Sequence, residues 1–279
     1  MREGTLHLFE AVNCLEDLFL KCAIDAQRPV ESVAESLCVV DLLPPVIPRR
    51  NVFCVGWNYQ EHFDEGAGKA ARAVKEIPAH PAFFSKTTTT VNSPHAPVPL
   101  HSPVTRRLDW EVELAVVIGK AGTSIAEANA LDHVFGYCVA NDVSARDLQS
   151  RHGGQWFKGK NLDGTCPLGP VLVTRDEIPD PQALDIVCRV NGIVKQRSNT
   201  RFQVYPVARL IAEVSAGLTL LPGDVILTGT PAGVGFARDP PECLADGDLL
   251  ESEIVGIGIL RNPISASVRH GRPQELGLV

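Results

Sequence analysis

The segment DWEVELAVVIGK, residues 109–120, indicates what kind of fold this chain adopts. Its second half, AVVIG, is an apolar run typical of a buried strand. Its first half alternates acidic and apolar residues, and successive side chains of a strand point to opposite faces. Asp109, Glu111 and Glu113 therefore share one face, where neighbours are roughly 6.5 Å apart and repel one another. Either water screens these charges or a cation binds among them.

Strand signals continue along most of the chain after residue 82. They include LAVVIG, YCVAND, GPVLVT, ALDIVCRVNG, DVILTG and LLESEIVGIGIL, separated by Gly, Pro and Asn turns. Helical patterns are few: SIAEANALDHV (124–134) opens with a capping box at Ser124 and Glu127, and YPVARLIAEVSAG (205–217) has one apolar face. The sequence therefore predicts a mixed α+β, β-rich roll or barrel with peripheral helices.

The length of 279 residues allows one large domain and a small additional one. LLPPVIPRR, residues 42–50, has three prolines in nine residues and predicts an extended linker. We therefore expect a small N-terminal domain and linker over residues 1–48 and a main domain over residues 49–264. Residues 265–279 lose the apolar periodicity and are expected to form a C-terminal tail.

The composition excludes several classes of partner. The net charge is −7 and there is no Lys/Arg run, so neither nucleic acid nor an anionic membrane is expected to bind. No apolar run approaches the ~20 residues that span a bilayer, and the N-terminus lacks the features of a signal peptide. Eight scattered cysteines without a CxxC pair are typical of reduced thiols in a cytoplasmic protein.

A further acidic residue, Asp142, ends the apolar run in CVANDVSARDLQ. Together with Glu111 and Glu113 it offers three carboxylates with no His or Cys beside them, a set that suits Mg²⁺, Mn²⁺ or Ca²⁺ rather than Zn²⁺. Three protein ligands leave about three positions of an octahedral shell for a chelating substrate and a water. The alternative is that the two glutamates form a solvated strand face and Asp142 caps a turn.

His62 and Glu65 form an H-x-x-E pair. On a helical turn, residues i and i+3 point the same way, and a carboxylate beside an imidazole favours a base that takes a proton from water. The same spacing occurs by chance on surface turns, which is the alternative interpretation. TGTPAGVG, residues 228–235, is glycine-rich but lacks the ending of a phosphate loop, so nucleotide binding is not expected.

Several ordered motifs resemble those of the fumarylacetoacetate hydrolase family. NVFCVGWNYQEH resembles the family's opening strand and NYxxH motif, and RLDWEVELAVVIGK resembles its metal-binding D-x-E-x-E-L segment. GYCVANDVSARDLQ, QWFKGKNLDGTCPLGP, VNGIVKQ, LLPGDVILTGTPAGVG and LADGDLLESEIVGIGILRN follow in the family's order. The resemblance covers about residues 50–263, and the first forty or so residues resemble the variable N-terminal domain of some members.

This resemblance implies a fold, a cofactor and a set of site residues. The fold is the family's β-roll or barrel with a small N-terminal domain, the cofactor is Mg²⁺ or Mn²⁺, and the assembly is a homodimer. The implied metal ligands are Glu111, Glu113 and Asp142, the catalytic residues are His62, Glu65 and Lys160, and the substrate-binding residues are Tyr59, Lys86, Gln149 and Thr230. Asp109 is not counted as a ligand and is expected to cap or bridge near the site.

Other interpretations of some of these residues stay open. For Lys86 and Lys160 the alternative is an ordinary surface lysine, and for Tyr59 it is a core aromatic residue. Asp147 and Asp163 are expected to be structural, paired with Arg146 and with nearby backbone.

The resemblance also implies an enzyme acting on 2-oxo acids that carry a second carbonyl or enol. The His62–Glu65 pair favours hydrolysis of a C–C bond in an acylpyruvate-like or fumarylpyruvate-like substrate, with Lys160 and the metal stabilising the enolate that leaves. The alternative is an isomerase or decarboxylase of 2-hydroxy-diene-dioates from aromatic-compound catabolism, which needs no attacking water. A non-catalytic binding protein is the third interpretation, and the intact site residues count against it. Residues 60–81, polar and rich in Gly and Ala, are expected to form a lid.

Overall fold

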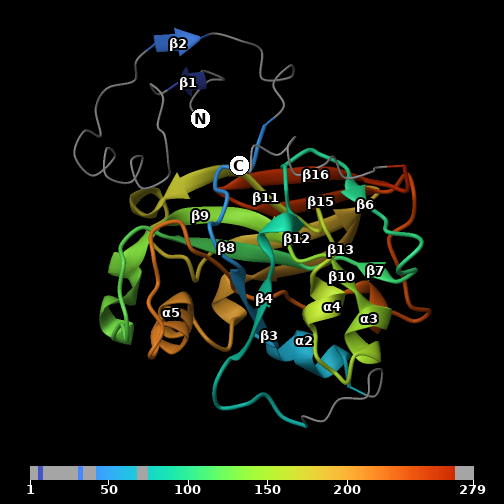
Figure 1. Cartoon of the computed structure of the whole chain (residues 1–279), viewed down its shortest axis with the longest axis horizontal. Helices are drawn as coiled ribbons and strands as arrows, with labels where there is room; N and C mark the ends of the chain where they lie inside the picture. Colours follow the sequence, from blue (N-terminus) through green and yellow to red (C-terminus); the bar gives the residue numbers. More distant parts are fainter. Residues whose placement is uncertain (1–5, 9–30, 34–41, 68–74, 268–279) are drawn as a thin grey trace.

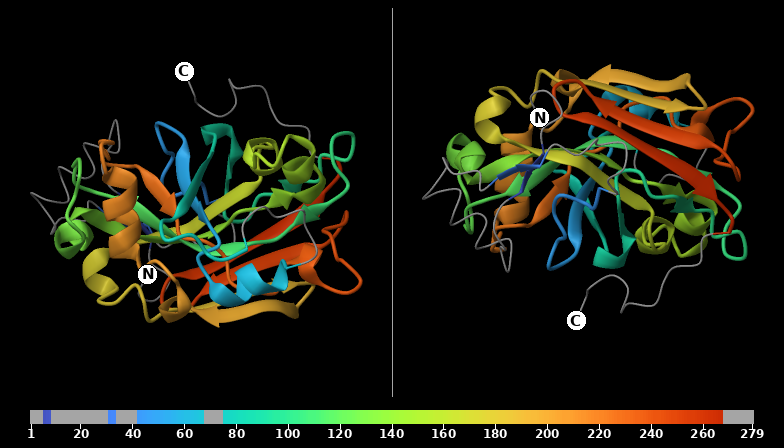
Figure 2. Two further views of the ribbon diagram at one scale, coloured as in Figure 1. Left: turned by 90° about the horizontal axis from the view of Figure 1, so that it is seen from below. Right: turned by 90° about the horizontal axis from the view of Figure 1, so that it is seen from above.

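The structure is a computed structural model that describes residues 6–8, 31–33, 42–67 and 75–267 (Figure 1). Two stacked β-sheets form the centre of the molecule, and short helices lie around them (Figures 1 and 2). The predicted β-rich fold with peripheral helices is therefore confirmed.

The larger sheet has seven strands, with β8 at its centre. Their order is β4 (Ala82–Lys86), β3 (Val52–Gly56), β14 (Val225–Leu227), β8 (Val112–Ile118), β9 (Val134–Asn141), β11 (Cys166–Thr174) and β5 (Val91–Asn92). β3 pairs with β14 and β11 with β5 in parallel, and the remaining neighbours are antiparallel. Two strands far apart in the sequence, β3 and β14, thus pair on one side of β8.

The smaller sheet has five strands and packs against β8, β9 and β11 of the larger one. Its order is β13 (Ile193–Asn199), β12 (Asp185–Val190), β15 (Leu249–Ile254), β16 (Gly258–Ser265) and β6 (Val98–Pro99). β13 is an edge strand of this sheet, a position that becomes important below.

Every residue of β8 is buried, as its apolar run predicts. Val112 and Leu114 belong to the core between the sheets, whereas Ala115 and Val117 belong to a second apolar cluster on the opposite face. Burying one such Val or Leu side chain contributes about 1.5 to 3 kcal/mol to the free energy of unfolding. Packing on both faces therefore fixes this strand, and with it the acidic residues at its start.

Short elements complete the fold. The helices are α2 (Gln60–Glu65), α3 (Arg146–Arg151), α4 (Phe157–Lys160) and α5 (Val207–Ser215). The 3-10 helices are η2 (Thr88–Thr90), η3 (Glu127–His133), η4 (Arg175–Glu177), η5 (Thr200–Phe202) and η6 (Gly235–Ala237). Two small sheets pair β7 (Leu108–Asp109) with β10 (Ser144–Ala145) and β1 (Leu6–Leu8) with β2 (Glu31–Val33). In Figure 1, α2, α3 and α4 lie on one side of the molecule and α5 on the other.

One of the two helix predictions is confirmed, and the other is confirmed only over Glu127–His133, as a 3-10 helix. The helix expected near the end of the chain is α5, whose apolar residues Leu210 and Ile211 are buried. The capping box at Ser124 does not form, because Ser124 has a φ of 50° and its Oγ accepts from the N–H of Gly217 at 3.3 Å. A 3-10 helix begins only at Glu127. The contact with Gly217, far away in sequence, overrides the local capping pattern.

The remaining predictions about organisation have mixed outcomes. Five cysteines lie in the described ranges; all are unpaired and four are buried, as expected of reduced thiols. None of the helices in those ranges has the length and apolar composition needed to cross a bilayer. Of the segment expected to form a lid, residues 68–74 lie outside the described residues. The domain boundaries at residues 48 and 264 stay predictions.

Candidate metal centre and active-site cleft

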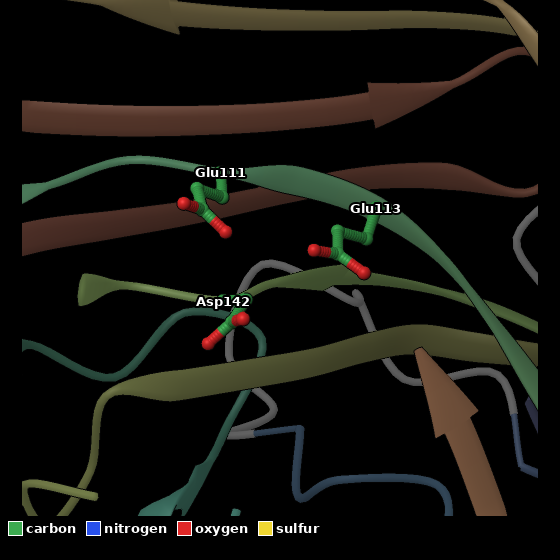
Figure 3. Close-up of side chains that lie close together, drawn as sticks. All are labelled: Glu111, Glu113 and Asp142. Atoms are coloured by element: carbon green, nitrogen blue, oxygen red, sulfur yellow. The ribbon is translucent and has the colours of Figure 1, made fainter. Parts of the chain in front are cut away.

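Three acidic side chains meet at the adjoining ends of β8 and β9. Glu111 precedes β8, Glu113 lies within it, and Asp142 follows β9. One oxygen from each carboxylate lies within 4.8 Å of the others, and all three residues are buried. Figure 3 shows the three carboxyl groups close together. The predicted cluster is therefore present, and its all-oxygen donor set fits a divalent ion such as Mg²⁺ or Mn²⁺.

The antiparallel pairing of β8 with β9 brings the acids together. Val112 is opposite Asn141, so the next residue out on each chain, Glu111 and Asp142, become neighbours. The N–H of Asp142 donates to the carbonyl of Glu111 at 2.8 Å, and the N–H of Glu111 donates to Oδ1 of Asn141 at 3.0 Å. Because a slip of one residue would turn these side chains to the other face, the strand register itself determines the site.

Three buried or nearly buried cations surround these acids. Nζ of Lys160 lies 2.7 Å from Oε2 of Glu111 and 2.7 Å from Oδ2 of Asp142. Nη2 of Arg146 lies 2.7 Å from Oε1 of Glu111, and Nζ of Lys86 lies 2.9 Å from Oδ1 of Asp142. Lys86 ends β4, Arg146 begins α3 and Lys160 ends α4. Pairing of this kind is what allows charged groups to remain ionised away from water.

The two glutamates of the centre have opposite pKa shifts. Burial alone would raise the pKa of Glu111, but the positive charges led by Lys160 outweigh it and lower that pKa to about 2. For Glu113, burial together with the negative charges of Asp142 and Glu111 raises the pKa well above its usual range. Of the two glutamates, Glu113 is the one whose negative charge the protein compensates less, and a bound divalent cation would compensate it.

Asp109 holds Arg146 in place. Its carboxylate accepts from Nε of Arg146 at 2.8 Å and from the backbone N–H groups of Trp110, Gly235 and Phe236 at 2.8, 2.6 and 3.0 Å. The residue is fully buried. The expected bridging role of Asp109 is therefore confirmed, and the residue it positions is an arginine that contacts a metal-binding glutamate.

His62 and Glu65 form a hydrogen-bonded pair on α2. Nδ1 of His62 lies 2.7 Å from Oε1 of Glu65, and the other oxygen, Oε2, accepts from the N–H of Gly233 at 2.7 Å. An ionised carboxylate can only accept hydrogen bonds, so this arrangement assigns the imidazole proton to Nδ1. Nε2 then remains as the nitrogen that can accept a proton.

His62, Glu111 and Glu113 line one cleft, whose volume is about 1140 Å³. Part of its wall is aromatic. The ring centroids of Trp156 and Trp57 are 4.7 Å apart in an edge-on arrangement, a separation at which aromatic rings attract each other. The lining also includes Phe84, Lys160, Gln149, Thr230 and the arginines Arg107, Arg146 and Arg238. Two residues of the acidic cluster, a candidate base and several cations thus face one space.

Comparison with known proteins gives this geometry a family. The family model described as fumarylacetoacetate (FAA) hydrolase, C-terminal, matches residues 51–265. The chain belongs to the fumarylacetoacetate hydrolase family. The oxaloacetate tautomerase YisK of Bacillus subtilis is 46% identical over 243 residues, which cover 86% of this chain and 79% of that protein.

Solved structures of family proteins are also similar. Fumarylacetoacetate hydrolase from the psychrophilic Exiguobacterium antarcticum is 40% identical, with a TM-score of 0.76 and coverage of 90% of this chain and 88% of that one. The 2-hydroxyhepta-2,4-diene-1,7-dioate isomerase from Mycobacterium marinum is 37% identical, with a TM-score of 0.71 and coverage of 87% and 84%. The names of these similar proteins thus include a tautomerase, an isomerase and a hydrolase.

The structure separates the four substrate-binding residues that the family resemblance implies. Gln149 and Thr230 line the cleft. Lys86 is fully buried against Asp142, behind the metal-binding cluster, and Tyr59 is 2% exposed with a pKa raised mainly by burial. Neither Lys86 nor Tyr59 is among the described residues that line the cleft. Their contact with substrate stays a prediction.

One expectation about the charged residues near the site is corrected. Asp147, expected to pair with Arg146, instead accepts from Oγ1 of Thr105 at 2.5 Å and from the N–H of Leu148 at 3.0 Å. Arg146 turns to the metal-binding cluster, a role that the sequence analysis did not assign. The available signal was its position shortly after Asp142, where a residue following a strand end faces the same cleft.

Proposed function

We propose that this family enzyme is a divalent-metal-dependent tautomerase or isomerase of 2-oxo dicarboxylic acids, of the kind represented by oxaloacetate. The observation that carries the proposal is that a candidate base, His62, and a buried ammonium group, that of Lys160, line the same cleft as the metal-binding glutamates. The similarity to an oxaloacetate tautomerase and to a hydroxydienedioate isomerase supports the same class of reaction.

Each side chain has a part in such a proton transfer. A divalent ion held by Glu111, Glu113 and Asp142 would act as a Lewis acid on a substrate carbonyl oxygen. Nε2 of His62 takes the proton from the carbon next to the carbonyl, or returns it, while Glu65 keeps Nδ1 protonated. Lys160 supplies positive charge where negative charge develops on the substrate oxygen. None of these steps consumes a water molecule.

Hydrolysis of a C–C bond, the main expectation from the sequence, is the second candidate. The hydrogen-bonded His62–Glu65 pair, at 2.7 Å, is the arrangement that activation of a water requires, so it favours this reaction as well. Among the similar proteins, the tautomerase and the isomerase support the alternative, whereas the Exiguobacterium antarcticum protein is named a hydrolase. The identity is higher to the tautomerase, at 46%, than to that hydrolase, at 40%, which favours tautomerisation. One type of experiment can distinguish the two reactions.

The enzyme with Mn²⁺ or Mg²⁺ is incubated in D₂O with oxaloacetate, a 2-hydroxy-diene-dioate or an acylpyruvate, and products are followed by NMR. We expect deuterium to enter beside the 2-oxo group, or the double bond to move, without cleavage of the carbon chain. The free ion at the same concentration and the Asp142→Ala variant correct for uncatalysed exchange. Release of a carboxylic acid with pyruvate from the acylpyruvate, faster than any exchange, would instead identify a hydrolase.

The assembly and the cellular location stay predictions. We infer a homodimer from the family resemblance, and a cytoplasmic location from the unpaired cysteines of the described ranges. Sedimentation velocity at micromolar concentration is expected to show a species of twice the 30.1 kDa chain mass, and a monomer alone would contradict the inference.

A further inference from the structure

A β-bulge turns one buried glutamine of the smaller sheet toward the metal centre. In the pairing of β12 with β13, Cys188 is opposite Gln196 but Arg189 is opposite Val194, so Lys195 is the extra residue. Bulges bend a strand and redirect its side chains. Gln196, the residue after the bulge, is only 1% exposed although it lies on an edge strand.

The side chain of Gln196 closes a ring of hydrogen bonds with β8. Its Oε1 accepts from the N–H of Val112 at 3.1 Å, and its Nε2 donates to Oγ1 of Thr230 at 2.8 Å. Oγ1 of Thr230 donates in turn to the carbonyl of Val112 at 2.9 Å. Val112 is the residue between Glu111 and Glu113. The ring therefore ties the peptide that joins two metal ligands to a cleft-lining threonine.

The bulge also supports the loop of residues 229–236. Nε2 of Gln196 donates to the carbonyl of Pro231 at 2.7 Å. Gly233, with a φ of 105°, lies so close to the carbonyl of Lys195 that a Cβ would be 2.1 Å from its oxygen. Only glycine fits this approach. The loop is thus packed directly on the bulged strand.

The same loop reaches three functional carboxylates through its backbone. The N–H of Gly229 donates to Glu113 at 2.6 Å and that of Gly233 donates to Glu65 at 2.7 Å, while the N–H of Gly235 binds Asp109. A shift of the loop therefore moves a metal ligand, the partner of the candidate base and the residue that holds Arg146 at the same time.

We propose that Gln196 is a positioning residue for the metal centre, through which the smaller sheet sets the placement of the carboxylates. An amide suits this place because it accepts with one atom and donates with the other, and no charged or apolar side chain does both. The inference rests on the proposed metal centre. Groups behind metal ligands typically change metal affinity by about 10- to 100-fold when they are replaced.

The test is the Gln196→Met variant, which keeps the length of the side chain without charge and removes its three hydrogen bonds. A matched control is Gln182→Met. Gln182 has the same bonding pattern: it accepts from the N–H of Val207 at 2.8 Å and donates to the carbonyl of Thr200 at 3.0 Å and to Oε1 of Gln203 at 2.9 Å. These three partners are not among the described residues that line the cleft.

Mn²⁺ affinity is measured by calorimetric titration, and the midpoint of thermal unfolding is measured for the same samples without metal. We expect the Mn²⁺ Kd of Gln196→Met to be at least about tenfold higher than that of the wild type. Gln182→Met should bind Mn²⁺ as the wild type does, even if its unfolding midpoint falls as far as that of Gln196→Met. Equal Mn²⁺ affinity in Gln196→Met and the wild type, or an equal loss in both variants, would overturn the inference.

Two further outcomes separate this inference from the proposed function. If the wild type itself does not bind Mn²⁺, the metal centre is wrong and the inference fails with it. If Gln196→Met does not fold, Gln196→Glu replaces it, because glutamate keeps the acceptor for Val112 and loses the amide donor. An added negative charge favours cation binding, so weaker Mn²⁺ affinity in Gln196→Glu supports displaced ligands, and unchanged or tighter binding overturns the inference.

Discussion

Glu111 and Glu113 lie on one face of the same strand, yet the two ends of the metal centre differ in charge. At the Glu111 end, Arg146 and Lys160 each contact the carboxylate at 2.7 Å, and its pKa falls. At the Glu113 end, a backbone N–H, that of Gly229, contacts the carboxylate at 2.6 Å, and its pKa rises. The difference shows that position on a strand determines where a carboxylate points. Groups supplied by segments far away in sequence determine how well its negative charge is compensated.

This asymmetry implies a division of roles within one cluster. The Glu111 end is balanced by the protein's own cations and contributes to folding even without metal. The Glu113 end carries a charge that is unfavourable in the buried site unless a divalent cation compensates it.

The largest effect is expected when a metal ligand is removed. Glu111→Ala and Asp142→Ala should abolish metal-dependent activity, because two carboxylates do not hold a divalent ion against water as three do. Calorimetric titration with Mg²⁺ or Mn²⁺ measures this directly. The control is Asp163→Ala, which changes an exposed aspartate three residues after Lys160 and should bind the metal ion as the wild type does. Undiminished affinity in Glu111→Ala or Asp142→Ala would contradict the ligand assignment.

Loss of the candidate base should have the next largest effect. His62 lines the same cleft as the two glutamates but is not itself one of the candidate metal ligands. His62→Gln should reduce turnover by about 10² to 10⁴ and leave Mn²⁺ bound, whereas Glu65→Gln should lose less because it acts through the imidazole. Steady-state rates and titration on the same samples are the measurement. A fully active His62→Gln enzyme would remove this residue from the mechanism.

Stability of the metal-free protein should distinguish the two ends. Glu111→Gln leaves Arg146 and Lys160 without part of their compensating charge, and breaking such a buried pair costs about 3 to 5 kcal/mol. Glu113→Gln removes a buried negative charge near two others and should be neutral or stabilising. Urea unfolding in the presence of a chelator measures both free energies of unfolding. Equal destabilisation by the two variants would show that the ends do not differ in this way.

The smallest effect concerns pH. Because the folded-state pKa of Glu113 lies above the ordinary value of about 4.3, the folded metal-free protein binds this proton more tightly than the unfolded chain does. Its contribution to stability is therefore present at low pH and is lost as the pH rises through that window. The advantage of Glu113→Gln over the wild type should grow from pH 4.3 upward, by at most about 1.4 kcal/mol per pH unit. A difference independent of pH would contradict the raised pKa.

The sequence predicted the parts of the site that depend on one strand or one helical turn. Alternation in β8 placed Glu111 and Glu113 on one face, and the spacing of His62 and Glu65 predicted their contact, because both patterns follow from local backbone geometry. The apolar run of β8 likewise predicted a buried strand.

The parts that the sequence did not reveal are contacts between distant segments. Lys86 contacts Asp142 but is fully buried and is not among the described residues that line the cleft. Ser124 does not cap a helix, because its Oγ accepts a hydrogen bond from the N–H of Gly217 instead. Gln196 ends the VNGIVKQ motif, but this motif did not indicate the role proposed for the residue, since that role depends on a bulge and on a loop that comes thirty or more residues later. Packing between elements, which no single segment encodes, decided these positions.

The parallel pairing of β3 with β14 has a consequence for the order of events during synthesis. Phe53 is opposite Ile226, and the loop that contacts Glu113 follows directly after β14. A nascent chain on the ribosome therefore contains His62, Glu111 and Asp142 long before the segment that completes their surroundings has been translated. Pairings over such sequence separations form late and slowly. We therefore expect metal capture to follow release of nearly the whole chain, and a translation product that stops before residue 225 to remain without a formed centre.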